Sequence, residues 1–144
     1  MSSWEQKAGA KRESIKASIP KEWIIPNVSP ESVPRAMDFP VDKYLSTAEQ
    51  EITGLLAVEL LGRLARGEYK AVDVVRAFAH RAAIAQQLVN CVIEFFWEEG
   101  LKQAKELDEY YANHGKVVGP LHGLPISLKG GIFLEEAYGR SIPC

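Results

Sequence analysis

Residues 119–129, Gly-Pro-Leu-His-Gly-Leu-Pro-Ile-Ser-Leu-Lys, hold the most structural information in this chain. Two glycines and two prolines specify a tight loop, because glycine tolerates backbone conformations that other residues rarely adopt and proline fixes φ. The loop leads into an apolar run that is typical of a buried β-strand. We therefore expect a strand over residues 124–129, with Lys129 at its end.

Lys129 is the candidate catalytic residue of this segment. A lysine at the end of a buried strand is partly desolvated, and desolvation lowers the pKa of an amine toward neutrality. A neutral amine can accept a proton from a hydroxyl, which is the step that activates a serine nucleophile. The alternative is a strand-end lysine that only reaches water, and spacing alone favours that alternative.

Helical patterns precede this segment. Residues 4–18 predict a polar surface helix. A capping box at residues 46–49, Ser-Thr-Ala-Glu, opens the first of two further helices, which Gly67 ends. Its expected apolar stripe is Leu56, Leu60, Leu61 and Leu64. The second helix is expected from Ala71 to Leu88, with an apolar face of Val72, Val75, Phe78, Ala79 and Ala82.

A strand and one more helix complete the pattern. Residues 91–96, Cys-Val-Ile-Glu-Phe-Phe, are short, β-branched and aromatic, and predict a buried strand in which Cys91 is an inert, small apolar residue. A helix is expected from Glu98 to Asn113, ended by His114 and Gly115. The order helix, strand, helix, strand predicts an α/β fold.

Residues 19–45 contain five of the eight prolines, so they form neither one helix nor a central strand. We call this segment the arm and expect it to lie extended over a larger body, with a disordered linker as the alternative.

Composition is that of an ordinary soluble domain, with 47% hydrophobic and 25% charged residues. A net charge of −2 gives no electrostatic reason to expect nucleic acid as a partner, and no apolar run is long enough to span a membrane. The first residues lack the pattern of a secretory signal, and two distant cysteines form neither a disulfide framework nor a zinc site. These features predict a cytoplasmic protein.

The three histidines show no metal-ligand spacing, so no metal or cofactor is expected. His80 is expected at the surface or boundary of a helix. His122 lies inside the loop and is expected to shape it rather than to react.

Residues 119–129 resemble the segment of amidase signature enzymes that usually ends Pro-Ile-Ser-Leu-Lys-Asp and carries their catalytic lysine. The similarity to fungal acetamidases and general amidases covers residues 3–129. It includes residues 3–5 (Ser-Trp-Glu), 19–23 (Ile-Pro-Lys-Glu-Trp), 81–88 (Arg-Ala-Ala-Ile-Ala-Gln-Gln-Leu), 90–91 (Asn-Cys) and 106–112 (Glu-Leu-Asp-Glu-Tyr-Tyr-Ala).

The resemblance implies an amide hydrolase with a Ser–cis-Ser–Lys triad, in which Lys129 is the lysine. It implies a fragment of the amidase signature fold, with amino-terminal helices and the first strands of a mixed sheet. The expected partner is a small-molecule amide substrate, and a homodimer is compatible with full-length relatives. No cofactor is implied.

The resemblance ends after Lys129, where Gly130 replaces the usual aspartate. The glycine- and serine-rich signature of the bridging serine is missing, and Ser127 and Ser141 lack glycine-rich surroundings. We expect this switch to reflect a truncated gene, a reading-frame change or a mis-joined exon.

The expected organisation is an amino-terminal helix and arm (1–45), the first part of an amidase domain (46–129) and a divergent tail (130–144). The chain is then an amidase fragment that is inactive alone. The alternatives are a non-catalytic remnant and a module that binds a full-length amidase.

Overall fold

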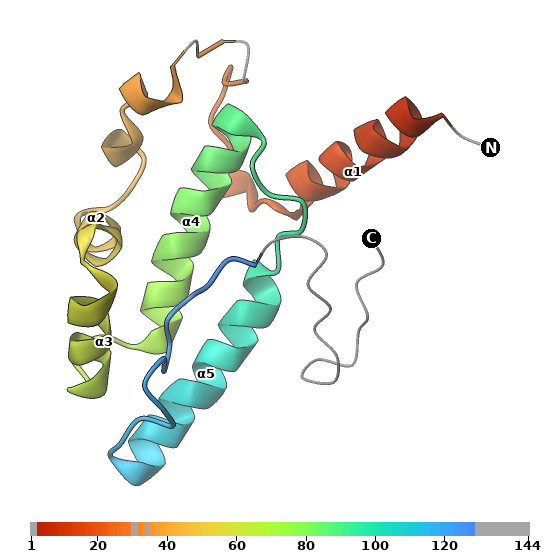
Figure 1. The fold of residues 1–144 in the computed structure, drawn as a ribbon. Coiled ribbons are helices and arrows are strands. Elements are labelled where there is room, and N and C mark those ends of the chain that lie inside the picture. Colours follow the sequence, from red (N-terminus) through yellow and green to blue (C-terminus); the bar gives the residue numbers. More distant parts are fainter. Residues whose placement is uncertain (1–2, 30–31, 34, 129–144) are drawn as a thin grey trace.

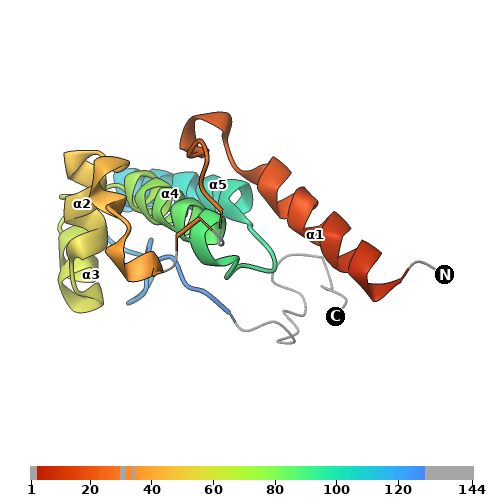
Figure 2. The same ribbon diagram turned by 90° about the horizontal axis from the view of Figure 1, so that it is seen from above.

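The computed structural model describes residues 3–29, 32–33 and 35–128, which form five α-helices and three short 3₁₀ helices. In Figure 1, α4 lies in the middle, with α5 on one side and α2 and α3 on the other, and α1 projects away from this group. Figure 2 shows the same projection of α1 from above. The bounds are α1 (Trp4–Ser18), η1 (Lys21–Trp23), η2 (Ala36–Asp38), η3 (Val41–Lys43), α2 (Thr47–Gly54), α3 (Ala57–Ala65), α4 (Ala71–Val89) and α5 (Trp97–His114).

The predicted helix ends follow from local chemistry. The capping box at the start of α2 is confirmed, since Ser46 and Glu49 each bond the other's backbone N–H. Gly67 after α3 and Gly115 after α5 have φ of 70° and 64°, the left-handed conformation that ends helices and favours glycine. The predicted helices at residues 4–18, 71–88 and 98–113 are confirmed to within one residue at each end.

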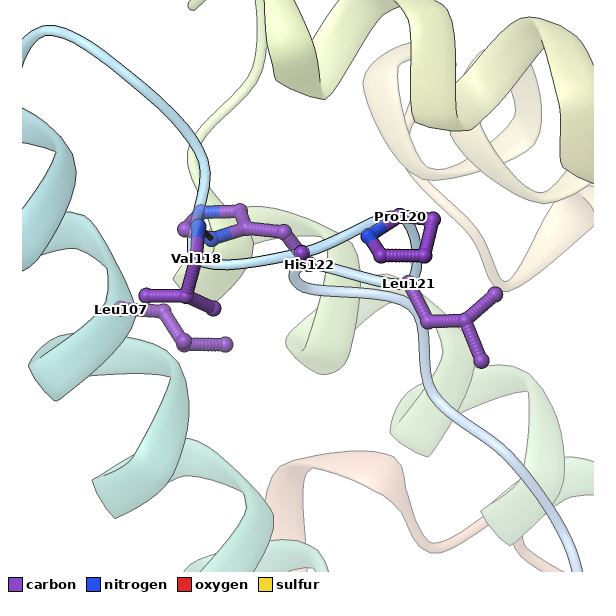
Figure 3. Close-up of a pocket in the computed structure, with 6 residues that line it drawn as sticks. Leu107, Val118, Pro120, Leu121 and His122 are labelled. Atoms are coloured by element: carbon purple, nitrogen blue, oxygen red, sulfur yellow. Dashed lines mark hydrogen bonds between the residues drawn. The ribbon is translucent and has the colours of Figure 1, made fainter.

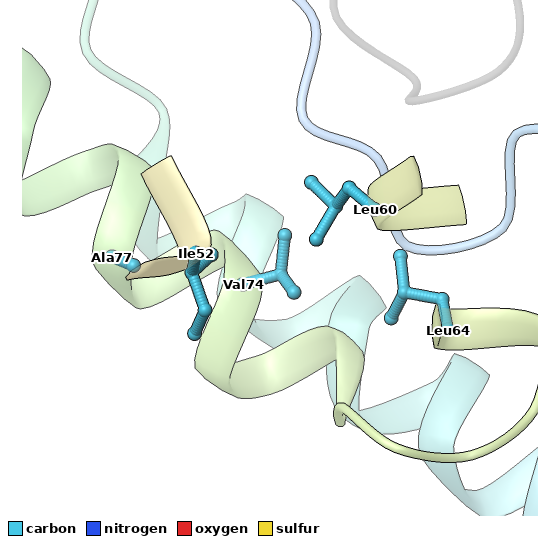
Figure 4. Close-up of a cluster of buried hydrophobic side chains, with 5 residues drawn as sticks. All are labelled: Ile52, Leu60, Leu64, Val74 and Ala77. Atoms are coloured by element: carbon cyan, nitrogen blue, oxygen red, sulfur yellow. The ribbon is translucent and has the colours of Figure 1, made fainter. Parts of the chain in front are cut away.

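Helix α4 organises the core, because it contributes to all three buried apolar clusters. The first cluster, drawn in Figure 4, joins α2, α3 and α4 through Ile52, Leu60, Leu64, Val74 and Ala77. The second and third clusters bind the arm to α4, through Ile19 and Trp23 in one and Ile25 and Leu45 in the other. The arm is therefore held along α4 by burial of apolar side chains.

The single helix expected after the capping box is wrong, because α2 and α3 are separate helices. Gly54 ends α2, and Leu55 and Leu56 both have extended backbones. This break removes Leu56 from the expected stripe: its side chain is 78% exposed, whereas Leu60 is 1% exposed.

The expected α/β fold is also wrong for the described residues, among which there is no strand. A strand exists only by pairing its backbone groups with a neighbour. No backbone hydrogen bond joins residues 91–96 to residues 124–128, and the N–H of Val92 donates instead to Gln86 Oε1 at 2.6 Å. Cys91, expected to be buried, is exposed.

Candidate functional site

The loop after α5 is tightly turned, as its glycines and prolines predict. The N–H of His122 donates to the carbonyl of Gly119 at 3.2 Å, and the N–H of Leu124 donates to the carbonyl of Leu121 at 3.1 Å. Leu124 then packs against the first core cluster. The chain is therefore fixed to the core five residues before Lys129.

His122 is buried, with 5% of its surface exposed. Its Nδ1 accepts the N–H of Val118 at 3.3 Å, so in the neutral ring the hydrogen is on Nε2. The ring of Tyr111 on α5 lies 6.2 Å away, between centroids. These contacts fit the loop-shaping role expected for His122.

Gly123 is where the loop touches the helices. Its φ is +73°, and a Cβ built on it would lie 2.9 Å from Cβ of Ala71 and 3.3 Å from Cδ2 of Leu64. Only glycine fits both this conformation and this close approach. The loop is thus seated on the start of α4 and the end of α3.

Asp108 of α5 caps the same end of α4. Its Oδ1 and Oδ2 accept the backbone N–H groups of Ala71 and Val72 at 2.7 and 3.1 Å. These N–H groups have no partner within the helix, and a carboxylate there also suits the helix dipole. No sequence pattern could identify this cap, because its residues are 36 and 37 positions apart.

Replacing Asp108 with alanine is expected to lower the free energy of unfolding by about 1–2 kcal/mol, because two N–H groups lose their acceptor. Chemical denaturation followed by circular dichroism measures this. Glu106→Ala is the matched control, since Glu106 is exposed on the same helix. Equal losses for the two variants would mean that the cap contributes nothing beyond helix propensity.

A shallow depression of about 380 Å³ lies beside the loop (Figure 3). Leu121 points away from His122 in this view. The depression contains no charged side chain, so it can hold an apolar group but offers no acid or base beyond the imidazole. It is lined by Leu107, Val118, Gly119, Pro120, Leu121 and His122.

Lys129, the predicted catalytic residue, lies outside the described residues. The segment that leads to it is exposed from residue 126 onward: Leu124 is half-buried, whereas Ile126 and Leu128 are 68% and 48% exposed. Ser127 is exposed as well. In the part of the chain that the structure describes, no group of three or more His, Cys, Asp or Glu residues could hold a metal ion.

His80 corrects another expectation, because it is buried rather than at the surface or at its boundary. The arm covers it: Trp23 stacks on the imidazole with ring centroids 4.9 Å apart. Its Nδ1 lies 2.9 Å from Oε1 of Glu49 on α2. No sequence pattern indicates this cluster, because its three members come from three separate elements.

None of the helices in the described ranges combines the length and the apolarity needed to cross a membrane.

Comparison with known proteins defines the class to which this architecture belongs. The family model described as Amidase matches residues 73–136, a range that includes Lys129. This part of the chain matches the amidase family, and the sequence is similar to fungal acetamidases over most of its length.

Individual relatives make the similarity specific. An acetamidase of Emericella nidulans is 52% identical over 128 residues, which are 88% of this chain and 23% of that protein. An amidase of Gibberella moniliformis is 40% identical, over 94% of this chain and 27% of its own length. A solved structure of a fatty acid amide hydrolase superposes with a TM-score of 0.69 and 41% identity, over 83% of this chain and 22% of that one. The chain thus spans about a quarter of the length of these relatives.

Proposed function

We propose that this chain is the amino-terminal part of an enzyme that hydrolyses a carboxamide to a carboxylate and ammonia, with Lys129 as its proton acceptor. The observation that carries the proposal is the family match over residues 73–136, since this range contains the lysine and the loop before it. The names of the relatives, acetamidase and fatty acid amide hydrolase, support amide hydrolysis as the reaction class.

The proposed mechanism uses Lys129 as a neutral amine. It accepts a proton from a bridging serine, and that serine deprotonates the nucleophilic serine, whose oxygen attacks the amide carbonyl. An acyl-enzyme forms as ammonia leaves, and water then hydrolyses the ester. Backbone N–H groups of a glycine-rich loop stabilise the oxyanion. In this proposal, both serines and this loop are supplied by the part of the enzyme that corresponds to the three-quarters of the acetamidase that this chain does not match.

The contacts of the loop hold residues 122–124, shortly before Lys129, in one position against the helices. Gly123 and Leu124 tie the segment to α3, α4 and the first core cluster, and His122 holds the turn. A base must be held in position to be effective, since small misplacements cost large factors in rate. We further propose a cytoplasmic location, a small-molecule substrate and no cofactor.

A chimera tests the proposal. The matching residues of the Emericella nidulans acetamidase are replaced by those of this chain, and ammonia release from acetamide is measured. We expect the chimera to be active and its Lys129→Ala variant to lose at least about a thousand-fold in kcat, as removal of one member of a catalytic triad does. Lys116→Ala, at an exposed position after α5, is the control and keeps the activity.

The 144-residue chain assayed alone is expected to release no ammonia above background. Activity of this chain that disappears with Lys129→Ala would contradict its description as an inactive part. A folded chimera that is active with alanine at position 129 would overturn the role of Lys129. Co-purification of the chain with an intact amidase, together with an inactive chimera, would favour a binding module instead.

A further inference from the structure

The Glu49 carboxylate joins the start of α2 to α4. Its Oε2 accepts the N–H and the hydroxyl of Ser46, at 2.7 and 2.8 Å, and so belongs to the capping box of α2. Its Oε1 lies 2.9 Å from Nδ1 of His80, in the middle of α4. Both oxygens of this carboxylate are thus engaged, each with a different element.

His80 extends the connection to the arm. The ring of Trp23 lies nearly parallel to the imidazole, with an interplanar angle of 14°, and Trp23 is itself buried. Gln87, two helical turns after His80 on the same helix, donates to the carbonyl of Trp23 at 2.9 Å. The contacts of Trp23, which we call its seat, therefore include the His80 ring, which is bonded to Glu49, and the Gln87 amide, which is not.

Protonation states follow from these contacts. Burial of the Glu49 carboxyl favours its neutral form, but the hydrogen bonds from His80 and Ser46 outweigh this and hold the pKa of Glu49 below its usual 4.5. Glu49 is therefore ionised at neutral pH. Because an ionised carboxylate can only accept, the hydrogen between the two side chains is carried by Nδ1 of His80.

We propose that Glu49 is an acid-sensitive link that couples the start of α2 to the seat of Trp23, so that a proton taken up by this carboxyl loosens both together. The proton must go to an oxygen that already accepts a hydrogen bond, and a carboxylic hydroxyl is a poorer acceptor than a carboxylate. Loss of the charge weakens the cap at Ser46 and the anchor of the His80 ring, on which Trp23 is stacked.

Other charged groups near the link are engaged elsewhere or exposed. On α2, Glu51 bonds Arg63 and Tyr69 rather than His80. On α4, Arg81 donates to Thr53. On η1, Lys21 and Glu22 are exposed and have no ion pair with Glu49 or His80 among the described residues. On α5, the residue whose ring packs against Trp23 is Trp97, and this ring carries no charge.

The direction of the pH effect follows from the lowered pKa of Glu49. Its contribution to stability is fully present above about pH 4.5 and is lost as pH falls through the lower pKa of the folded state. The hydrogen bonds of Glu49 with Ser46 and His80 are therefore intact at neutral pH and weaken only in acid.

NMR titration of the ¹⁵N-labelled chain tests the coupling. We follow the indole N–H signal of Trp23, assigned with Trp23→Phe, and the backbone amide of Glu49, which donates to Ser46 Oγ. Both signals are expected to shift with one common midpoint below pH 4.5. Different midpoints in the unmodified chain would overturn the proposal without any variant having to fold.

Variants separate the parts of the link. Glu49→Gln should abolish the acid shift of the Trp23 signal, whereas Glu51→Gln, on the same helix, should leave it in place. His80→Gln should remove the Trp23 shift but keep the shift of the Glu49 amide. An unchanged Trp23 titration in Glu49→Gln would refute the coupling.

Discussion

Gly123→Ala is expected to lower the free energy of unfolding by about 2–5 kcal/mol. Two costs combine. An alanine in the left-handed conformation costs about 1–2 kcal/mol, and the backbone of Gly123 has φ of +73°. A further cost of about 1–3 kcal/mol arises from overpacking, because the new methyl would lie 2.9 Å from Cβ of Ala71.

Gly115→Ala carries only the first cost, so the difference between the two variants measures the second. Gly115 has φ of +64°, but a Cβ there would meet nothing within 4 Å. This variant should lose only about 1–2 kcal/mol. Urea denaturation of both variants, followed by circular dichroism, gives the comparison. Equal losses would show that the loop does not press on the start of α4, and the proposed seat of the loop before Lys129 would then be wrong.

Leu60→Ala is expected to cost about 2–5 kcal/mol, as complete truncation of a buried leucine does when a cavity remains. Leu60 is 1% exposed and lies among Ile52, Leu64 and Val74 (Figure 4), so its removal opens space between α2, α3 and α4. The same denaturation measurement reports the loss.

Leu56→Ala is the matched control, because both leucines were expected on one apolar stripe and only the structure separates them. Leu56 is 78% exposed, so its truncation should change stability by no more than about 0.5 kcal/mol. A large loss for Leu56→Ala would mean that α2 and α3 form one continuous helix in solution, as the sequence pattern predicted.

Much of the helical structure could be predicted because it depends on neighbouring residues. Ser46 and Glu49 are three positions apart and cap α2 by themselves, and Gly67 and Gly115 end helices through their own backbone freedom. The turn around His122 was likewise predictable from its glycines and prolines.

The two strands could not be predicted correctly because a strand depends on a partner. Residues 91–96 have the β-branched and aromatic composition of a strand, but in the described chain the N–H of Val92 bonds a glutamine side chain. The composition of a segment indicates whether it suits a pleated sheet, but not whether a second strand is present to pair with it.

Helix α4 was predicted correctly, but the face that it buries was not. The spacing of Val72, Val75 and Phe78 indicated an amphipathic helix, and the helix exists. Its fully buried residues are instead Ala71, Val74, Ala77, Ala83 and Ile84, because α4 is apolar on several sides and is covered by α2, α5 and the arm. Periodicity alone cannot choose among faces of similar hydropathy.

The amino-acid sequence by itself determined α1, α4 and α5, the start of α2, the glycines that follow α3 and α5, the loop before Lys129 and the resemblance to amidases, since each depends on residues close together in the chain. Only the tertiary structure decided that Asp108 caps α4, that Gly123 presses on Ala71 and that Glu49, His80 and Trp23 meet. These contacts join residues from 31 to 57 positions apart, and such distances are closed by packing, whose outcome no local pattern encodes.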